Sequence, residues 1–273
     1  MIVVTGATGF VGRELTRQLR AGKIEHRVLP RGGDMEAALA GAKAVIHLVG
    51  IIHERGENTF EHVHVELTRR MVEAAKAAGV RRFLHMSALG TRPGARSRYH
   101  QTKWAAEELV RQSGLAWTIF RPSVIYGPGD VSINELAKTM RRLPVMPVLG
   151  DGNGKIQPVS VENVARAFVA ALKNDATIGK TYDLCGPVAF TWNELYDKLG
   201  SLLGLRRPKV HLTLGVAHMI AEVLELCIPQ PPFNRDQLLM VQEDNVGDPG
   251  PARRDLFIEL ESFEEDAARY LAR

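Results

Sequence analysis

The chain has few cysteines and no long, purely apolar run. Of its 273 residues only Cys185 and Cys227 are cysteines, and they do not have the spacing of metal ligands. This excludes a disulfide framework and a cysteine-based metal site, and it favours a reducing compartment. The most apolar late stretch, residues 212–228, carries His218 and two glutamates, so we predict an amphipathic or core helix and not a membrane span.

Net charge and aromatic content are also low. The 35 Lys and Arg residues exceed the 31 Asp and Glu residues by four, giving a net charge of +4, and 6% of the residues are Phe, Trp or Tyr. The basic residues occur as scattered pairs, such as Arg69-Arg70 and Arg253-Arg254. A single-strand nucleic-acid binder needs a continuous basic face with interleaved aromatic rings. We therefore expect no nucleic-acid partner.

The N-terminal residues indicate the cellular location of the protein, and the chain length indicates its number of domains. Nothing before Ile2 resembles a signal peptide, because a strand-like run begins at once, and we expect a cytoplasmic protein. We expect no transmembrane segment, while a peripheral membrane contact stays open. A chain of 273 residues with 45% hydrophobic residues is long enough to bury a core in one large or two modest domains.

Strand and helix patterns alternate over the first part of the chain. The predicted strands are residues 1–5, 27–29, 44–49, 82–86 and 116–121. The predicted helices are residues 10–21, 35–39, 60–78 and 99–112. Successive strand–helix units require right-handed crossovers. The pattern therefore predicts the α/β class, with a doubly wound parallel sheet of the Rossmann type.

The pattern changes after Pro122. Gly- and Pro-rich segments at 127–129 and 150–154 flank a short predicted helix over 134–142. We expect residues 156–160, a helix over 161–173 and a strand over 181–184 to return to the sheet edge. The later predicted helices are residues 192–203, 216–226 and 263–271. We therefore predict a dinucleotide-binding domain over 1–125 and 156–185, and a smaller, helix-rich, discontinuous second lobe over 126–155 and 186–273.

A glycine-rich turn lies between the first strand and the first helix. Residues 5–12 read TGATGFVG, with glycines at three-residue spacing. Such glycines allow a tight turn and let the backbone approach a pyrophosphate, whose charge the helix N-terminus stabilises. The turn therefore predicts a dinucleotide cofactor. Its candidate cofactor-binding residues are Thr5, Gly6, Thr8, Gly9, Phe10, Val11, Gly12 and Arg13.

The end of the second strand distinguishes the two nicotinamide cofactors. An acidic side chain there would accept a hydrogen bond from the ribose 2′-OH of NAD, whereas an arginine would pair with the 2′-phosphate of NADP. Arg31 follows the second strand, and Arg13 follows the third glycine. We therefore favour NADP(H), with NAD(H) as the alternative. Asp34 is the candidate residue for contacting the edge of the adenine ring.

Tyr99 and Lys103 lie four residues apart at the start of a predicted helix, so they project from one face. A phenol is a poor base at neutral pH, but a neighbouring ammonium and the positive nicotinamide ring would lower its pKa. Tyr99 would then exchange a proton with a substrate hydroxyl or carbonyl. The alternative is a Tyr and Lys that hold a cofactor without turnover.

Two further groups of side chains could in principle bind a ligand, either a metal ion or an anionic substrate. The first consists of His47, His53, His62 and His64. Because His62 and His64 are two apart on a predicted helix, they point in different directions, and we expect no metal site. The second group consists of Arg92, Arg96 and Arg98. These arginines precede Tyr99, where they would either grip an anionic substrate at the mouth of the site or stay solvated.

These motifs together resemble the short-chain dehydrogenase/reductase superfamily. Within it they are similar to the extended and atypical NAD(P)-dependent epimerase/dehydratase group, which includes the NDUFA9-type accessory subunit of respiratory complex I. The resemblance lies in residues 5–12, 47–50, 87, 99–103, 121–123 and 126–129. It implies that Lys103 holds the nicotinamide ribose and that Ser87 orients the substrate oxygen, so that Ser87, Tyr99 and Lys103 form the catalytic set. The cofactor-binding residues that it adds are Leu48, Val49, Gly50, Lys103, Arg121, Pro122, Ser123 and Val124.

The resemblance implies two alternative functions. One is an oxidoreductase or sugar-nucleotide epimerase/dehydratase with a small-molecule substrate such as a nucleotide sugar. The other is a catalytically silent, NADP(H)-binding accessory or assembly protein of a respiratory or membrane-associated complex. Members of the superfamily usually have the strand order 3-2-1-4-5-6-7, but here residues 31–33 leave no room for the usual helix and third strand. We therefore predict a shortened sheet edge on the adenine side.

Overall fold

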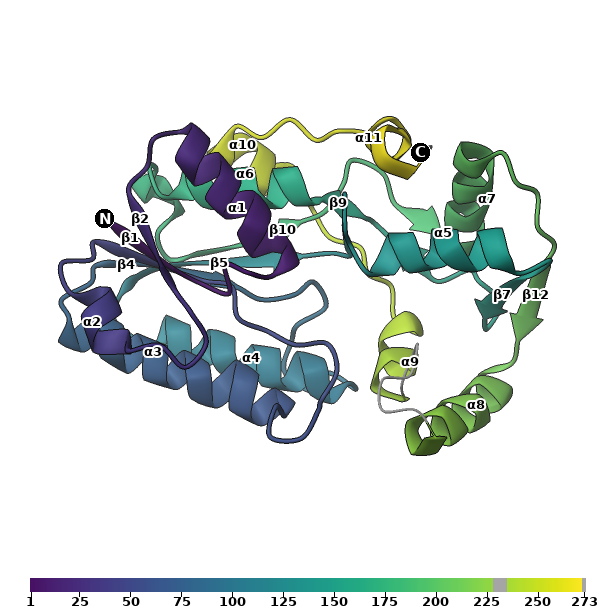
Figure 1. The fold of residues 1–273 in the computed structure, drawn as a ribbon, viewed down its shortest axis with the longest axis horizontal. Helices are drawn as coiled ribbons and strands as arrows, with labels where there is room; N and C mark the ends of the chain where they lie inside the picture. Colours follow the sequence, from purple (N-terminus) through teal and green to yellow (C-terminus); the bar gives the residue numbers. More distant parts are fainter. Residues whose placement is uncertain (228–234, 272–273) are drawn as a thin grey trace. The chain divides into compact units, whose positions relative to one another are not determined.

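The structure is a computed structural model that describes residues 1–227 and 235–271. The chain forms two compact units (Figure 1). The first unit consists of Met1–Pro122, Val161–Leu184 and Asp248–Leu260. The second unit consists of Ser123–Ser160, Cys185–Gly247 and Glu261–Arg273.

The first unit is built on a six-stranded sheet in the spatial order β10-β5-β4-β3-β1-β2. Its strands are β1 (Ile2–Thr5), β2 (His26–Leu29), β3 (Ala44–His47), β4 (Arg82–Met86), β5 (Ala116–Pro122) and β10 (Lys180–Leu184). All neighbouring strands are parallel, and Thr5, His47 and His85 lie in register across β1, β3 and β4. The prediction of a doubly wound parallel sheet is confirmed. The carboxyl ends of the strands therefore meet at one edge, where ligands of this architecture bind.

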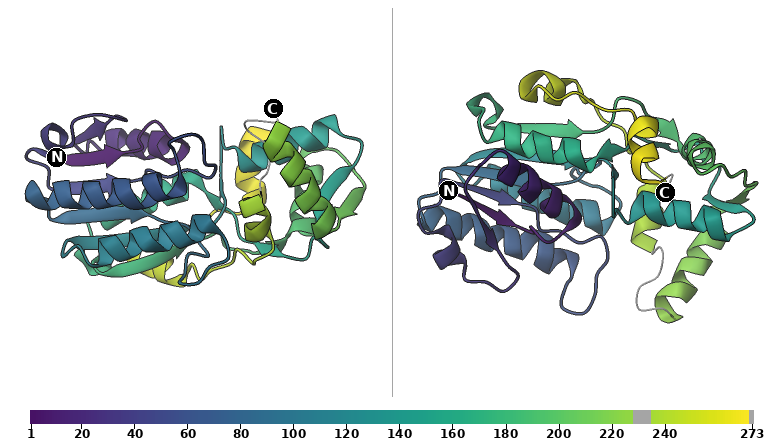
Figure 2. Two further views of the ribbon diagram at one scale, coloured as in Figure 1. Left: turned by 90° about the horizontal axis from the view of Figure 1, so that it is seen from below. Right: turned by 45° about the horizontal axis from the view of Figure 1, so that its top comes forward.

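Helices cover both faces of this sheet (Figure 1). One face carries α1 (Phe10–Ala21), α6 (Val161–Ala171) and α10 (Gly250–Leu256). The other carries α2 (Met35–Leu39), α3 (Leu67–Ala77) and α4 (Arg98–Arg111), and the π-helical segment η1 (Glu61–Glu66) leads into α3. Figure 2 shows α3 and α4 side by side. Buried apolar side chains such as Val45, Met71, Phe83 and Ile119 fill the space between the strands and this second helix layer.

The sheet ends at β2 on one side, within the residues that the structure describes. After β2 the chain makes the short helix α2 and continues into β3, which lies on the other side of β1. The predicted shortening of this edge is confirmed. Its cause is the spacing noted in the sequence: Pro30 to Gly33 form a turn that leads directly to the cap of α2.

The second unit combines short strand pairs with helices. The pairs are β6 (Ile125–Tyr126) with β9 (Val159–Ser160), β7 (Met146–Leu149) with β12 (Lys209–Leu212), and β8 (Lys155–Ile156) with β11 (Phe190–Thr191). The helices are α5 (Ser132–Arg142), α7 (Trp192–Leu203), α8 (Leu214–Cys227), α9 (Arg235–Val241) and α11 (Phe263–Leu271). Its buried core includes Ile133, Leu195 and Phe263.

Several predicted segments differ from the structure. The strand expected over 156–160 is interrupted after Ile156, and its two parts pair with β11 and β6 instead of joining the main sheet. Pro158 lies at this interruption and has no N–H to donate to a ladder. The helix expected over 60–78 begins with the wider π-helical turn η1. The boundaries expected for the two domains also differ from the two units, chiefly because α10 packs on α6 and β10 and brings residues 248–260 into the first unit.

Candidate functional site

The glycine turn after β1 is packed too tightly for side chains. Gly6 has a φ of +68°, and a Cβ on it would lie 3.1 Å from the carbonyl carbon of Leu48. A Cβ on Gly12 would lie 2.2 Å from the carbonyl oxygen of Gly6. The N-cap position of α1 is Gly9, so no side chain caps this end of the helix, and Thr8 and Gly9 are exposed. The turn thus presents bare backbone and a helix N-terminus to a ligand, which is the arrangement that dinucleotide pyrophosphates need.

The predicted adenine-side residues have partners within the chain. Arg13 donates from Nη1 to the carbonyl oxygen of Thr8 at 2.9 Å, and Arg31 donates to the side-chain oxygen of Asn58. The carboxylate of Asp34 caps α2 by accepting from the amides of Glu36 and Ala37, at 2.9 and 3.1 Å. Arg13, Arg31 and Asp34 are all exposed, so these bonds are open to exchange with a ligand.

Residues Leu48 to Gly50 follow β3 and lie beside the glycine turn. The amide of Leu48 donates to the carbonyl oxygen of Thr5 at 3.4 Å, which joins the ends of β1 and β3. Gly50 lies against Lys103, since a Cβ on Gly50 would be 2.8 Å from the ammonium nitrogen. Sequence reasoning assigned Gly50 to the cofactor, but its close approach to Lys103 is visible only in the folded chain.

The three predicted catalytic residues lie in the first unit, at the ends of β4 and α4. Ser97 caps α4 by accepting from the amide of His100, at 3.2 Å, so Tyr99 and Lys103 lie in the first two turns. Lys103 is buried and donates from Nζ to the carbonyl oxygen of Met86 at 3.2 Å. Ser87, the next residue after Met86, is also buried, and its hydroxyl is 3.5 Å from that of Thr91. Lys103 is thereby brought to the carboxyl end of β4, next to Ser87.

Burial dominates the acid–base properties of this group. It raises the pKa of Tyr99 to about 12, whereas we had expected the Lys103 ammonium to lower it. The Tyr99 ring is enclosed by the rings of Phe60, His64 and His100, with centroids 5.2–5.8 Å away. Burial also lowers the pKa of Lys103 to about 8, against a smaller opposing effect of Glu107. Tyr99 therefore keeps its proton at neutral pH in this structure.

A cluster of buried histidines lies behind this group. His47 contacts the hydroxyls of Thr5 and Thr68, at 2.8 and 3.2 Å, and stacks on His85 with ring centroids 5.7 Å apart. His64 is buried within η1, whereas His62 points outward and pairs with Glu66 at 2.7 Å. The two histidines do point in different directions, as expected. Among residues 1–227 and 235–271, no group of three His, Cys, Asp or Glu side chains is placed to hold a metal ion.

From the sequence, His64 was considered only as a metal ligand and received no part in the cofactor site. The available signal was its place between two apolar residues, Val63 and Val65, and in the structure all three are buried. Three consecutive buried positions do not fit one face of an α-helix. The π-helical turn accommodates them.

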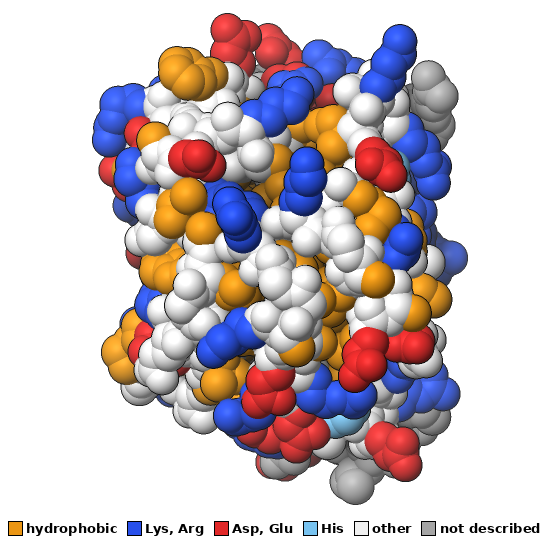
Figure 3. Space-filling model, turned by 90° about the vertical axis from the view of Figure 1, so that its left-hand side faces the viewer, with side chains coloured by type: hydrophobic (Ala, Val, Ile, Leu, Met, Phe, Trp, Pro, Cys, Tyr) orange, Lys and Arg blue, Asp and Glu red, His pale blue; other side chains and the backbone are white. Residues whose placement is uncertain are grey.

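Arginines near the predicted site are paired within the chain. Arg98 donates to Glu54 at 3.0 Å, and Arg92 donates to the carbonyl oxygen of Gly90 at 3.0 Å. Arg121, predicted to contact the cofactor, forms a bidentate pair with the fully buried Glu107, at 2.6 and 2.8 Å. On the face drawn in Figure 3, Lys and Arg side chains are interspersed with acidic and hydrophobic ones.

Ser123 and Val124, the last predicted cofactor contacts, belong to the second unit, whereas Pro122 ends the first. Ser123 donates its hydroxyl proton to Asn245, and the carbonyl oxygen of Val124 accepts from the amide of Val159 at 3.0 Å. These bonds hold the start of the second unit to its own later segments.

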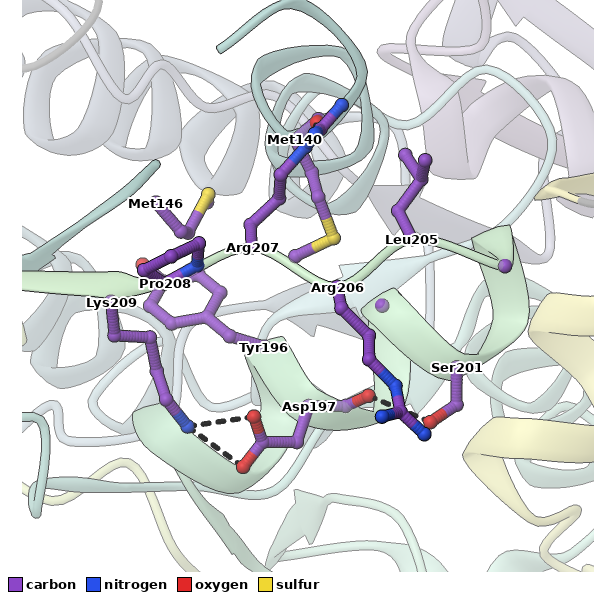
Figure 4. Close-up of a pocket in the computed structure, with 12 residues that line it drawn as sticks. Met140, Met146, Tyr196, Asp197, Ser201, Leu205, Arg206, Arg207, Pro208 and Lys209 are labelled. Carbon is purple, nitrogen blue, oxygen red and sulfur yellow. Dashed lines mark hydrogen bonds and ion pairs between the residues drawn. The ribbon is translucent and has the colours of Figure 1, made fainter. Parts of the chain in front are cut away.

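The second unit also contains a cavity of about 740 Å³, which no predicted site residue lines (Figure 4). Met140, Met146 and Tyr196 form part of its wall. Two of its cations have internal partners: Lys209 pairs with Asp197 at 2.7 Å, and Arg207 donates to the carbonyl oxygen of Met140 at 3.0 Å. In Figure 4 the side chains of Arg206 and Arg207 extend in opposite directions, so they do not converge on one point of the cavity.

Comparison with known proteins places these features in context. A family model described as the NAD dependent epimerase/dehydratase family matches residues 2–185. The chain is 32% identical over 280 residues to the NADH dehydrogenase (ubiquinone) 1 alpha subcomplex subunit 9, mitochondrial, of Arabidopsis thaliana; the match covers 89% of this chain and 70% of that protein. It is 31% identical over 234 residues to ceramide reductase of Caulobacter vibrioides, with 78% and 73% covered.

Solved structures show the same fold. UDP-glucuronic acid 4-epimerase from Bacillus cereus, in complex with UDP-glucuronic acid and NAD, superposes with a TM-score of 0.75 at 20% identity, covering 99% of this chain and 97% of that one. Within the described part of the present chain, no helix has the length and apolar character needed to cross a membrane.

Proposed function

Because the chain belongs to the NAD dependent epimerase/dehydratase family, we propose that its first unit binds a nicotinamide dinucleotide at the glycine turn. The observation that carries this proposal is the tight packing of Gly6 and Gly12, where a Cβ would collide with backbone atoms. A turn used only for packing would not need the exposed surface at Thr8 and Gly9, beside an α1 N-terminus that no side chain caps. The glycine turn would hold the pyrophosphate, and residues 48–50 and Lys103 would hold the nicotinamide half.

NADP(H) is the proposed cofactor, with NAD(H) as the alternative. Arg13 and Arg31 are exposed, and their present bonds are single contacts with a carbonyl oxygen and an amide oxygen. A 2′-phosphate would offer each guanidinium a charged and geometrically better partner. Asp34 is engaged as a helix cap and would meet the adenine edge only by giving up those bonds.

The proposed chemistry is proton transfer by Tyr99, assisted by Lys103 and Ser87. When bound, the nicotinamide ring exchanges a hydride with a substrate carbon. A pKa of about 12 makes the Tyr99 phenol an acid at neutral pH, so it would deliver its proton to a substrate carbonyl oxygen. Ser87 would donate a hydrogen bond to that same oxygen. Lys103, largely protonated below pH 8, would stabilise the phenolate that remains.

The protonated form of Tyr99 is the one that reduction uses. Reduction needs an acid at the substrate oxygen, whereas oxidation needs a base, and Tyr99 is protonated at neutral pH in this structure. The name of the relative from Caulobacter vibrioides, a ceramide reductase, agrees with that direction. The proposed substrate is therefore a small molecule that carries a ketone or aldehyde, with nucleotide sugars as the second class to be tested.

A second candidate function is that of an accessory protein that binds the dinucleotide without turnover. It is supported by the relative from Arabidopsis thaliana, which is named as a subunit of an NADH dehydrogenase. A bound dinucleotide would then stabilise the fold by mass action. Because that relative is named as mitochondrial, the cytoplasmic location stays a prediction.

One experiment separates the two functions. The purified protein is denatured, any released nucleotide is identified by mass spectrometry, and native protein loaded with NADPH or NADH is mixed with aldehydes, ketones and sugar nucleotides while absorbance at 340 nm is followed. Consumption by wild type but not by Tyr99→Phe supports the enzyme. Because an epimerase or dehydratase returns the hydride to its product and leaves the dinucleotide unchanged, the sugar nucleotides are also incubated with protein loaded with NAD or NADP and analysed for conversion by chromatography. A tightly bound nucleotide with neither consumption nor conversion supports the accessory protein, and failure to bind either dinucleotide overturns both.

A further inference from the structure

The buried imidazole of His64 bonds to both a helix and a loop of the first unit. Its Nδ1 lies 2.9 Å from the hydroxyl oxygen of Thr102 in α4. Its Nε2 lies 3.2 Å from the amide nitrogen and 3.1 Å from the carbonyl oxygen of Ile51, in the loop that follows β3. His64 is 1% exposed, so these contacts are shielded from water.

Both ring nitrogens of His64 have partners in either neutral tautomer. With the proton on Nδ1, that nitrogen donates to the Thr102 hydroxyl, whose own proton goes to the carbonyl oxygen of Arg98 or Tyr99, at 2.9 and 3.0 Å, and Nε2 accepts from the Ile51 amide. With the proton on Nε2, that nitrogen donates to the carbonyl oxygen of Ile51 and Nδ1 accepts from Thr102. In both tautomers Nε2 holds the backbone of Ile51 by one directed hydrogen bond.

Burial keeps His64 neutral. It is the largest of the effects that lower the pKa of His64 to about 2, and the positive charge of Lys103 adds to it, against a smaller opposing effect of the hydrogen bond with the Ile51 backbone. The ring therefore stays uncharged across the physiological pH range, and its bond to Ile51 is that of a neutral imidazole.

The Ile51 amide is adjacent to the close contact between Gly50 and Lys103. A Cβ on Gly50 would lie 2.8 Å from Lys103 Nζ and 3.7 Å from His64 Nε2, so both side chains flank the same glycine. The His64 ring also stacks on Phe60 and meets the Tyr99 ring edge-on, with both centroids 5.4 Å away. The position of the Gly50–Ile51 peptide, and with it the space beside Lys103, depends on His64.

We propose that His64 is a positioning residue, which holds the Gly50–Ile51 backbone in place for the nicotinamide half of the cofactor. The inference rests on the proposed function, because it assigns a role within the same dinucleotide site. It concerns only the nicotinamide half: the glycine turn, which would hold the adenosine diphosphate half, makes no contact with His64 in the bonds described above. Loss of the bond between Nε2 and Ile51 should therefore weaken binding of the complete dinucleotide and leave binding of the half-cofactor unaffected.

Two substitutions of His64 distinguish the roles of its two ring nitrogens. His64→Gln places its side-chain amide near the position of Nε2, where it can accept from the Ile51 amide or donate to the Ile51 carbonyl oxygen, whereas His64→Asn reaches only the position of Nδ1 and its bond with Thr102. His62→Gln and His62→Asn serve as matched controls on the same segment, because His62 is 42% exposed and pairs with the exposed Glu66. Circular dichroism and thermal unfolding establish that each variant is folded.

Binding is measured by calorimetry with NADPH, NADH and ADP, and protection of the Ile51 amide is measured by hydrogen exchange. We expect His64→Asn to bind the preferred dinucleotide about tenfold more weakly, as for one lost buried hydrogen bond, with unchanged affinity for ADP. Protection of the Ile51 amide should fall by a similar factor. His64→Gln and both His62 variants should stay within about twofold of wild type.

Three results would overturn the inference. Equal loss in His64→Asn and His64→Gln would mean that the contact with Ile51 is not the important one. An ADP affinity that falls with the NADPH affinity would indicate a general structural defect. Unchanged protection of the Ile51 amide in His64→Asn would show that the bond does not hold the loop. If the wild-type protein binds neither a dinucleotide nor ADP, the proposed function itself is wrong. The three results above, in contrast, reject the His64 inference while wild type still binds the cofactor.

Discussion

Gly50 and Lys103 are packed so closely that no side chain fits between them, since a Cβ on Gly50 would stand 2.8 Å from the Lys103 ammonium nitrogen. The contact joins the loop after β3 to α4, which are far apart in sequence. Lys103 also bonds to the carbonyl oxygen of Met86 at the end of β4. One buried ammonium thus lies where three segments meet at the carboxyl edge of the sheet.

The first prediction concerns Gly50→Ala. The new methyl group would displace the end of the flexible Lys103 side chain, so we expect little change in the thermal midpoint but a clear loss of dinucleotide affinity, about tenfold. Calorimetric titration with NADPH and NADH provides the measurement. Gly215→Ala is the control, because a Cβ there meets no atom within 4 Å. Wild-type affinity in Gly50→Ala would show that the position of the ammonium is unimportant for binding.

Gly12→Ala should damage both folding and binding. A Cβ on Gly12 would lie 2.2 Å from the carbonyl oxygen of Gly6, and this backbone atom cannot move without opening the turn. We expect a loss of about 1–3 kcal/mol in the free energy of unfolding, as for other overpacked sites, and no measurable dinucleotide binding. Urea denaturation and a fluorescence titration with NADPH test both expectations. Gly22→Ala at the other end of α1 meets its nearest neighbour at 3.4 Å and should be mild in comparison.

The ion pairs of Glu107 should contribute to stability. Its carboxylate is fully buried and bonds to Arg121 at 2.6 Å and to Arg111 at 2.5 Å. Glu107→Gln removes the charge and keeps the shape, and because both arginines are partly exposed we expect a loss of about 2 kcal/mol in the free energy of unfolding. The half-exposed Glu108, which also pairs with Arg111, is the control, and Glu108→Gln should cost less than about 1 kcal/mol. Equal losses would contradict a special role of burial.

Acid should destabilise the first unit through its buried histidines. Burial lowers the pKa of His85 well below its ordinary value, and the nearby His47 and Lys103 add to the effect. In the unfolded chain His85 is therefore protonated below about pH 6.5, whereas in the folded chain it stays neutral. The free energy of unfolding consequently falls as the pH decreases below that value. Neither ring nitrogen of His85 has a hydrogen-bond partner in the described part of the chain.

His85→Leu tests this relationship. At pH 7.5 we expect unchanged or higher stability, because the substitution removes a buried polar group that has no partner. Between pH 6 and pH 5 the variant should lose about 1 kcal/mol less than wild type, since one proton fewer is linked to unfolding. Urea denaturation at these three pH values is the measurement. Parallel pH profiles for the two proteins would mean that His85 does not carry the acid sensitivity.

Much of the first unit could be predicted from local sequence patterns. The glycine turn, the strands over 82–86 and 116–122, and the helix that begins near Tyr99 follow from residue spacing and turn chemistry, which depend on neighbours a few positions away. The shortened sheet edge followed from the number of residues between Arg31 and Gly33, because a helix and a strand cannot fit into so short a connection. In each case the backbone geometry alone limits the outcome.

Other features depend on which distant segments pack together, and only the tertiary structure decided them. Spacing placed Tyr99 and Lys103 on one helix face, but the rings around Tyr99 come from Phe60, η1 and α4. Burial among them raises the pKa of Tyr99, whereas the sequence predicts a lower pKa from the ammonium and a bound nicotinamide ring. The contact of Gly50 with Lys103 and the bond from Ile51 to His64 likewise join separate parts of the chain. Burial and desolvation depend on the sum of all neighbours in space, and for that reason the sequence determined where the reactive groups lie along the chain, while the packed fold decided their protonation and their partners.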